Sequence, residues 1–305
     1  MSKSFTLAHL SDVHLSGVTG FAPRHWNTKR ALGFFNWHVK RARVHSRTVA
    51  DKLVADAVAL RTDHIAITGD LINLGLPAEY DAALSWLKGI GPSDRITVVP
   101  GNHDIYTRLS GHPGVARWAA YMGSEELSLA FPFVRRVGPL AIVGLNSAIE
   151  TPPFVASGRL GAHQIEVAGE MLERWKGEDV IRVVLIHHPP LPGLASTRRA
   201  LEDAAHFARV LQHAGAELVL YGHNHCQRLN WHAHVHAEGG GAIPVIGVPS
   251  ASAARTHKDE PLARYNIFTF FQSSEGLRIR HAVRGLESPD GDVVKLSETV
   301  LEHAS

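Results

Sequence analysis

The sequence ITVVPGNHD at residues 96–104 sets a β-branched run directly before a Pro-Gly turn and three polar side chains. A short apolar run that ends in turn residues is typical of a strand buried on both faces of a sheet. The same pattern, an apolar run followed by polar residues, also occurs at 5–12, 64–70, 140–147, 181–188 and 217–223. We therefore predict six buried strands, each with polar side chains near its carboxyl end.

Amphipathic segments separate these strands. Apolar residues recur at helical spacing at Val49, Leu53, Ala57 and Leu60, at Ala83, Leu84 and Leu87, and at Ile165, Ala168 and Leu172. The last quarter of the chain instead shows strand patterns separated by turns, at 228–236, 243–248, 265–271 and 277–283. The alternation predicts an α/β fold, and we expect the β-rich last quarter to pack as a second sheet.

The composition is that of a globular protein. Hydrophobic residues make up 45% and charged residues 20% of the 305 residues, and no repeat, low-complexity tract or Pro/Gly/Ser linker divides the chain. We therefore expect a single domain over residues 1–305. The net charge of +2 gives no general argument for nucleic acid binding, whereas the 21 histidines supply many candidate metal ligands.

Cysteine usage and hydropathy bear on location. The single cysteine, Cys226, excludes an internal disulfide framework and a cysteine-only zinc cage, which fits a reducing compartment. The N-terminus carries no long apolar segment, and no stretch approaches the roughly 18 uncharged apolar residues that a membrane span requires. We expect a cytoplasmic protein with neither a signal peptide nor a transmembrane helix.

Polar side chains at the predicted strand ends form the most informative pattern in the sequence. Those that follow an apolar run by at most a few residues are Asp12, Asp70, Asn102, His187 and His223. Open α/β sheets place their ligand sites at the carboxyl ends of the strands. One parallel sheet would therefore bring these side chains to a common rim.

The residue types at this rim suit metal ions. Asp12 and His14 are separated by one residue, so in an extended segment both side chains leave on the same face and can bind one ion. The two oxygens of the Asp70 carboxylate can bridge two ions. The remaining donors are the carbonyl of Asn102 and the imidazoles of His187, His223 and His225. This mixture predicts a pair of transition-metal ions, either Mn, Fe, Zn or Co.

His103 and Asp104 complete the expected chemistry. Two ions roughly 3.5–4 Å apart acidify a bridging water and stabilise charge on phosphoryl oxygens. An uncoordinated side chain beside the leaving group can donate a proton, and His103, next to Asn102, is the candidate. Asp104 would orient His103 if the two side chains meet.

Five motifs, SDVH, TGD, GNHD, HHPP and GHNH, occur in an order that resembles the calcineurin-like metallophosphoesterases. The resemblance covers about residues 5–250. Within that family, the stretch at 69–80 and HHPPLPG at 187–193 are similar to class III cyclic-nucleotide and glycerophosphodiester phosphodiesterases. The resemblance implies a four-layer α/β/β/α sandwich in which two mixed sheets pack face to face, with the metal ions at their rim.

The resemblance also implies a division of ligands between the two ions. One ion would bind Asp12, His14, Asp70 and His225, and the other would bind Asp70, Asn102, His187 and His223. His103 would be the catalytic histidine. The residues expected to contact the substrate are Asn73, His188, Arg41 and Trp37.

The segment between the first two predicted strands is basic and aromatic. Residues 13–50 contain no Asp or Glu, and their fixed positive charges are Arg24, Lys29, Arg30, Lys40, Arg41, Arg43 and Arg47. The aromatic residues among them are Trp26, Phe34, Phe35 and Trp37. We expect a helical insertion over about 21–47 that caps the metal rim. A surface helix with a solvated basic face is the competing interpretation.

Helical spacing within the insertion predicts which side docks on the body of the protein. The expected docking face consists of Leu32, Phe35, Val39 and Ala42. The side chains expected to face elsewhere are Phe34, Trp37 and Arg41. A cationic, aromatic cap suits an anionic substrate with an apolar or flat portion, or peripheral contact with anionic lipid.

Two further features have both a structural and a functional interpretation. His232, His234 and His236 share one face of a predicted strand, where they would either form an additional metal or phosphate site or face solvent. Cys226 directly follows the last predicted ligand, and we expect it to have a structural role.

The sequence therefore predicts hydrolysis of a phosphodiester, whether small, nucleotide or lipid-linked, by attack of a hydroxide that bridges the two ions. The alternatives are a phosphomonoesterase with the same site and a non-catalytic, metal-stabilised interaction protein. A nuclease is disfavoured because the sequence has no separate basic domain. Selectivity is expected to come from the cap and from the loops at 106–135, 150–160 and 189–200.

Overall fold

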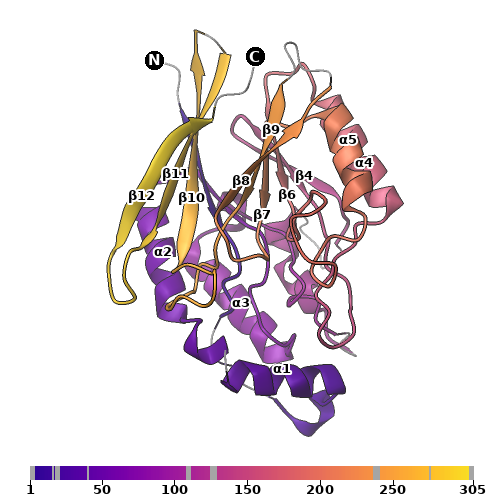
Figure 1. Ribbon diagram of the computed structural model, residues 1–305, viewed down its shortest axis with the longest axis vertical. Helices are drawn as coiled ribbons and strands as arrows, with labels where there is room; N and C mark the ends of the chain where they lie inside the picture. The colour runs from indigo at the N-terminus through magenta and orange to yellow at the C-terminus, as the bar shows by residue number, and fades with distance from the viewer. Residues whose placement is uncertain are drawn as a thin grey trace.

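Two six-stranded sheets form the centre of the computed structural model, with helices on their outer sides (Figure 1). The structure describes residues 4–15, 17, 21–39, 41–107, 111–123, 129–235, 241–274 and 276–301. The main flanking helices are α2 (Arg47–Ala59) and α3 (Pro77–Ile90) beside the first sheet, and α4 (Ala162–Arg174) and α5 (Ala204–Ala214) beside the second. The predicted α/β/β/α sandwich of two packed mixed sheets is confirmed.

The first sheet has the order β12-β11-β10-β1-β2-β3. Its strands are β1 (Phe5–Leu10), β2 (His64–Ile67), β3 (Ile96–Val98), β10 (Arg264–Ser273), β11 (Gly276–Leu286) and β12 (Val293–Leu301). β1, β2 and β3 run parallel, whereas β10 pairs antiparallel with β1. The strands that precede Asp12, Asp70 and Asn102 therefore lie side by side in one sheet.

The second sheet has the order β4-β5-β6-β7-β9-β8. Its strands are β4 (Phe133–Val137), β5 (Leu140–Gly144), β6 (Ile181–Leu185), β7 (Leu218–Tyr221), β8 (Arg228–Ala233) and β9 (Ala242–Gly247). The four central strands run parallel, and β4 and β8 pair antiparallel at the two edges. This sheet carries His187 after β6 and His223 after β7.

Successive residues of the second sheet pack into two different cores. In β6, Val183 and Leu185 belong to the core that the two sheets share, where they join residues such as Phe268 of the first sheet. Val184 packs instead with Leu172 and other residues of the outer helices. Because neighbouring side chains of a strand leave on opposite faces, β6 is buried on both sides. Burial on both sides explains the apolar run at 183–185.

Two expectations about strand pairing are wrong. The rim side chains do not come from one parallel sheet, because the strands before Asp12, Asp70 and Asn102 lie in the first sheet and those before His187 and His223 in the second. The β-rich last quarter does not form a sheet of its own. β10, β11 and β12 extend the first sheet and β8 and β9 extend the second, since both sheets offer an edge beside their parallel strands.

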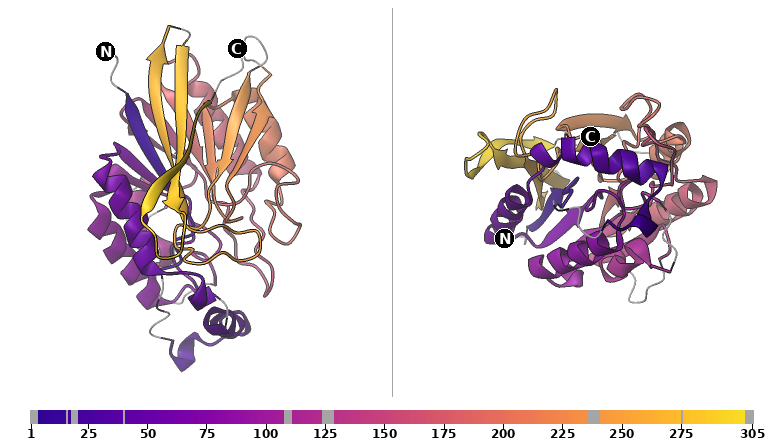
Figure 2. Two further views of the ribbon diagram at one scale, coloured as in Figure 1. Left: turned by 60° about the vertical axis from the view of Figure 1, so that its left-hand side comes forward. Right: turned by 90° about the horizontal axis from the view of Figure 1, so that it is seen from below.

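The basic, aromatic segment contains α1 (Thr28–Val39) between two short 3-10 helices, η1 (Pro23–His25) and η2 (Arg41–Arg43). Figure 2 shows this segment beyond one end of the sheets, and α1 crosses the molecule when it is seen from below. None of the helices in the described part of the chain is both long and apolar enough to cross a bilayer.

The docking face of α1 is the opposite of the one predicted. Trp37 is buried, and the buried guanidinium of Arg30 donates hydrogen bonds to the carbonyls of Leu74 (3.2 Å) and Gly75 (3.1 Å). The predicted docking residues are exposed: Leu32, Phe35, Val39 and Ala42. The body presents backbone carbonyls to α1, and these carbonyls require a donor that an apolar face cannot supply. Lys40 lies outside the described residues.

Candidate metal centre

Most of the predicted ligands stand on left-handed backbone. The φ angles are 53° at Asp12, 42° at His14, 54° at Asp70, 68° at His223 and 52° at His225. This conformation is uncommon outside glycine and costs of order 1–3 kcal/mol per residue. The left-handed conformation turns the chain sharply just after a strand. The backbone strain therefore lies at the residues whose side chains form the rim.

Close packing of backbone and side chains fixes the same turns. A Cβ atom added to Gly101 would clash with the Asp70 carboxylate and lie 2.8 Å from Cε1 of His187. The backbone N–H of His223 donates to Asp12 Oδ2 over 2.9 Å, which joins the rims of the two sheets directly. The site is therefore built from both sheets and tolerates no side chain at Gly101.

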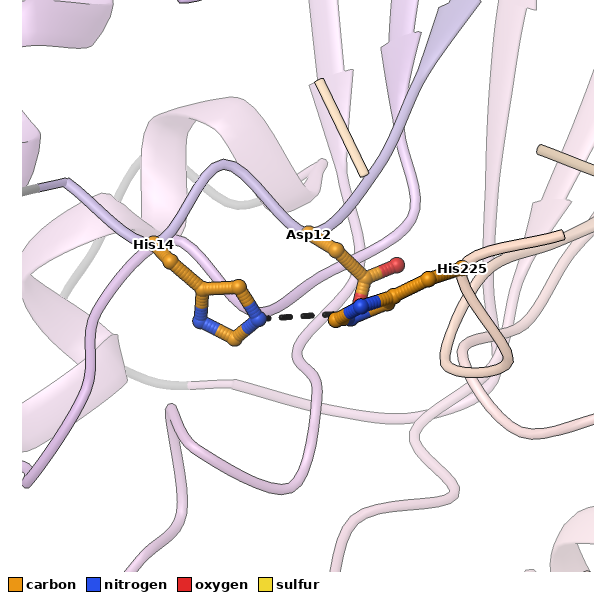
Figure 3. Close-up of side chains that lie close together, drawn as sticks. All are labelled: Asp12, His14 and His225. Carbon is orange, nitrogen blue, oxygen red and sulfur yellow. Dashed lines mark hydrogen bonds and ion pairs between the residues drawn. The ribbon is translucent and has the colours of Figure 1, made fainter. Parts of the chain in front are cut away.

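Asp12, His14 and His225 form the first cluster of candidate ligands (Figure 3). Nε2 of His225 lies 3.1 Å from Asp12 Oδ1, and Nε2 of His14 lies 3.8 Å from the same oxygen. Nε2 of His14 is also 3.8 Å from Asp70 Oδ2. All four side chains are buried.

Asn102, His187 and His223 form a second cluster, which approaches the same Asp70 oxygen through His187. Asn102 Oδ1 is 3.1 Å from His187 Nε2 and 2.9 Å from His223 Nδ1, and these two nitrogens are 3.2 Å apart. His187 Nε2 lies 3.5 Å from Asp70 Oδ2. Asp70 Oδ2 therefore stands between the two clusters, and the structure brings together all seven residues expected to bind metal.

These donors fit two metal ions. Ligands about 2.0–2.2 Å from a metal ion lie roughly 3–4 Å from one another, which is the spacing seen in both clusters. Nitrogen atoms that approach to 3.2 Å, as in His187 and His223, are suited to share one cation. Burial and the nearby Asp12 carboxylate raise the pKa of Asp70 to about 8, so the two buried acids need positive charge beside them. Mixed imidazole and carboxylate donors favour transition metals.

The far nitrogens of the histidines are also held. Nδ1 of His187 lies 2.6 Å from the Thr68 carbonyl, and Nδ1 of His225 lies 2.9 Å from Glu260 Oε2. Such partners keep the proton on Nδ1 and direct the lone pair of Nε2 to the metal. Although burial opposes protonation, Asp12 and Glu260 raise the pKa of His225 to about 9. Sequence reasoning missed Glu260, because it belongs to no motif and lies 35 residues beyond His225.

His103 lies beside the clusters with one nitrogen toward the cleft. Its backbone N–H donates to Asp70 Oδ1 (2.8 Å), and its Nδ1 lies 2.6 Å from the carbonyl of Asn73. Nδ1 therefore carries the proton and donates it to that carbonyl. Nε2 accepts a hydrogen bond from Nη1 of Arg41 over 2.7 Å. Burial and the Arg41 charge hold the pKa of His103 well below its usual value.

Asp104 does not serve as the expected partner of His103. Its carboxylate accepts hydrogen bonds from the backbone N–H groups of Asp70, Leu71 and Gly101 at 2.8–2.9 Å. It thereby holds together the two turns that carry Asp70 and Asn102. The Asn73 carbonyl, and not Asp104, orients the imidazole of His103.

Of the residues expected to contact substrate, Arg41 alone reaches the cleft with its charged group. Its Nη2 donates to His14 Nε2 over 2.8 Å while Nη1 donates to His103. Asn73 is buried and donates through Nδ2 to the Leu15 carbonyl (2.9 Å), so its side chain points away from the cleft. Trp37 is buried with its ring stacked on His45, at 6.4 Å between centroids.

His188 is also a supporting residue and not a substrate contact. It is buried, its Nδ1 lies 2.8 Å from Ser147 Oγ, and its Nε2 lies 3.2 Å from the Ala156 carbonyl. Both ring nitrogens therefore bind protein groups, which leaves His187 as the candidate ligand of the pair. A second residue that sequence reasoning missed, Arg199, donates to the carbonyl of His223 over 2.6 Å and lines the cleft.

The remaining polar candidates lie away from this centre. His232 Nε2 is 2.7 Å from the Ala208 carbonyl of α5, and His236 lies outside the described residues. Among the described residues, the groups able to hold a metal all belong to the centre above, so the histidine row gains no support as a second metal site. Cys226 Sγ contacts the Asp259 carbonyl at 3.9 Å, in keeping with a structural role.

Comparison with known proteins identifies the family. A family model described as calcineurin-like phosphoesterase matches residues 5–227. The chain belongs to this family, as its motifs predicted. Among solved structures, a dimetal phosphatase from Danio rerio has a TM-score of 0.60 at 15% identity and covers 97% of this chain and 99% of its own. At that identity the likeness shows the fold.

Two curated relatives carry phosphodiesterase names. A probable cyclic nucleotide phosphodiesterase of Synechococcus is 28% identical over 195 residues, which is 62% of this chain and 65% of that protein. A cAMP/cGMP dual specificity phosphodiesterase of Mycobacterium tuberculosis is 25% identical over 232 residues, which is 72% of this chain and 62% of that protein. The matched region spans less than two thirds of either relative.

Proposed function

We propose that this protein is a metal-dependent phosphoric ester hydrolase that cleaves phosphodiesters. The observation that carries the proposal is the position of Asp70 Oδ2, which lies 3.8 Å from His14 Nε2 and 3.5 Å from His187 Nε2. One carboxylate oxygen thus serves two ligand clusters, with His103 beside them. The names of the two curated relatives support a diester over a monoester.

The proposed ligands follow the two clusters. One ion would be held by Asp12, His14, Asp70 and His225, and the other by Asp70, Asn102, His187 and His223. When bound, two such ions acidify a water molecule and offset the charge that develops on the phosphoryl oxygens. Imidazole-rich coordination favours transition metals as a class, here Mn, Fe, Zn or Co, and does not choose among these four.

The side chains around the ions would orient the ester and move the proton. Nε2 of His103 faces the cleft without a proton, so it would first accept a proton from water and then pass it to the departing oxygen. Nδ1 remains bound to the Asn73 carbonyl and keeps the ring in place. Arg41 and Arg199 both line the cleft and supply the positive charge that an anionic ester requires.

We place the protein in the cytoplasm, because a chain with one cysteine suits a reducing compartment.

The cap, residues 21–47, would also make peripheral contact with anionic lipid. Trp26 is 56% exposed, and residues 13–50 contain no acidic side chain. Exposed aromatic and basic side chains are the combination that binds the surface of an anionic bilayer. Cosedimentation with phosphatidylserine vesicles tests this contact, and equal binding to neutral vesicles would contradict it.

A substrate panel tests the hydrolase proposal. The protein should be assayed with bis(4-nitrophenyl) phosphate and 4-nitrophenyl phosphate in the presence of Mn, Fe, Co or Zn. We expect metal-dependent release of nitrophenol, with a larger kcat/KM for the diester. Faster turnover of the monoester would identify the protein as a phosphomonoesterase and not a phosphodiesterase. Absence of hydrolysis with metal bound at both sites would favour the interaction protein.

A further inference from the structure

Two hollows meet at the metal cleft. The first, of about 360 Å³, lies over the candidate ligands and extends toward His257, Lys258 and Glu260. The second, of about 630 Å³, lies between α1 and the segment 153–156. Side chains common to both are Asn36, Arg41, Asn102, His103, Ala156 and Arg199. We call the first the polar wing and the second the apolar wing of one continuous site.

Two facing parts of the wall of the apolar wing are hydrocarbon. Leu32, Phe35 and Val39 recur along one side of α1, and Phe154 and Val155 line the opposite wall. Phe35 is 69% and Phe154 79% exposed, so both rings lose contact with water if a ligand enters. Phe154 also has a φ of 65°, a strained conformation for a bulky residue. A strained turn that presents an aromatic ring to a site is typical of a functional position.

The charges on the wall of the apolar wing favour a ligand with negative charge. Lys29, Arg41 and Arg199 line the apolar wing, and the lining residues that the structure describes include no Asp or Glu. The Lys29 ammonium lies 4.5 Å from the centre of the Tyr106 ring and 3.1 Å from Thr151 Oγ1, so it is held at the wall. The wing therefore suits a ligand that combines a negative charge at the cleft with an apolar part beyond it.

Hydrogen-bonding capacity favours a hydrocarbon chain over a nucleoside. A base is recognised by hydrogen bonds to its edges as well as by stacking. Among the described residues that line the wing, only Asn36 and the candidate ligand Asn102 carry a side-chain amide, and Asn36 lies at the junction with the polar wing. Away from this junction, Lys29 and Tyr106 already donate to protein groups, Thr151 Oγ1 and the Lys29 carbonyl. The rest of that wall includes Leu32, Val39 and Phe154, which offer only hydrocarbon.

We propose that the apolar wing binds a hydrocarbon substituent of an asymmetric phosphodiester, whose other, polar substituent lies in the polar wing. This inference rests on the proposed function and names its substrate class, an amphiphilic diester. Two unlike wings on either side of one phosphate position suit a diester, since a monoester has a single substituent to place. The hydrogen bond of His188 with the Ala156 carbonyl attaches the wall of the apolar wing to the metal rim.

Binding of alkyl phosphates tests the inference without turnover. Calorimetry of the metal-loaded protein should measure Kd for ethyl, butyl and hexyl phosphate. Burial of hydrocarbon predicts that Kd falls about fourfold for each added methylene. The double variant Phe35→Ala and Phe154→Ala should flatten this dependence. Trp26→Ala is the matched control, because Trp26 is an exposed aromatic of the same segment outside the lining of the wing, and it should leave the dependence intact.

The outcomes separate this inference from the proposed function. A chain-length dependence that is flat in the unaltered protein, or that survives loss of both phenylalanines, would overturn the apolar wing. If thymidine 5′-phosphate binds more tightly than hexyl phosphate, and the double variant weakens its binding, the ligand of the apolar wing would be a nucleoside and not a hydrocarbon chain. Failure to hydrolyse any diester would overturn the proposed function alone, since Kd is measured without catalysis. Unchanged metal content and melting temperature establish that the variants fold.

Discussion

Replacing Arg41 by alanine should tighten the binding of the first metal ion. The Nε2 atom of His14 accepts a hydrogen bond from Nη2 of Arg41 over 2.8 Å, while its Nδ1 faces the Ile72 carbonyl at 3.3 Å. Nε2 has a single lone pair, which can face the guanidinium or a metal ion but not both. The guanidinium must therefore leave His14 when this nitrogen coordinates a metal ion.

The structure sets the size of the effect. A hydrogen bond that involves a charged group contributes roughly 1.5–3 kcal/mol. At 1.36 kcal/mol for each factor of ten, removal of this competing bond should increase the affinity for the first ion by about 10-fold to 150-fold. Loss of the Arg41 charge beside Asp70 and Asp12 acts in the same direction, because it removes a competing partner of both carboxylates.

Titration calorimetry with Mn and Zn measures this affinity in Arg41→Ala. Arg43→Ala is the control, since Arg43 belongs to the same 3-10 helix, η2, but is exposed. Affinity should rise in Arg41→Ala and stay unchanged in Arg43→Ala, while KM for a diester rises in Arg41→Ala alone. Weaker binding of the first ion by Arg41→Ala would refute the reasoning. It would mean that the guanidinium orders the ligands instead of competing for them.

Three further substitutions test other parts of the structure. Glu260→Gln should weaken metal binding by roughly 10-fold to 100-fold, the usual scale for a partner of a ligand histidine, and unchanged affinity in calorimetry would contradict its role. His103→Asn should keep its metal content by elemental analysis while kcat falls by about 10²–10⁴-fold; loss of metal would make His103 a ligand. His64 is buried, and burial, with a smaller effect from Arg135 and Arg95, lowers its pKa to about 3. The unfolded chain therefore binds more protons below pH 6.5, and stability should fall by about 1.4 kcal/mol per pH unit from there toward pH 3. Urea unfolding at pH 7 and pH 5 should show a smaller loss in His64→Gln, and an equal loss would refute the assignment.

The sequence predicted the rim residues well because a local rule governs them. An apolar run buried on both faces identifies a strand, and the polar residue after it must lie at the end of the sheet. Asp12, Asp70 and His187 follow this rule and meet at the rim. Pairing between strands obeys no such local rule, so the sharing of β8 to β12 between the two sheets was not predictable from periodicity.

The cap illustrates what amphipathic spacing leaves out. Spacing groups Leu32, Phe35 and Val39 on one side of a helix but does not say whether that side meets the body, a ligand or solvent. Backbone groups distant in sequence determine which side of α1 meets the body, because the carbonyls of Leu74 and Gly75 require donors and Arg30 supplies them. The apolar side of α1 is left to line the cleft.

Asp104 shows how the same motif can serve structure and chemistry together. Its carboxylate accepts hydrogen bonds from the backbone of both Asp70 and Gly101 at 2.8 Å, so the turns after β2 and β3 are one hydrogen-bonded unit. Asp70 stands in this unit on left-handed backbone, and His103 donates its own N–H to Asp70 Oδ1. The Asp70 carboxylate, which we propose bridges the two ions, is thus placed by bonds that need no metal ion. A centre held in this way binds its ions without paying to order the turns, because folding of the first sheet has already ordered them.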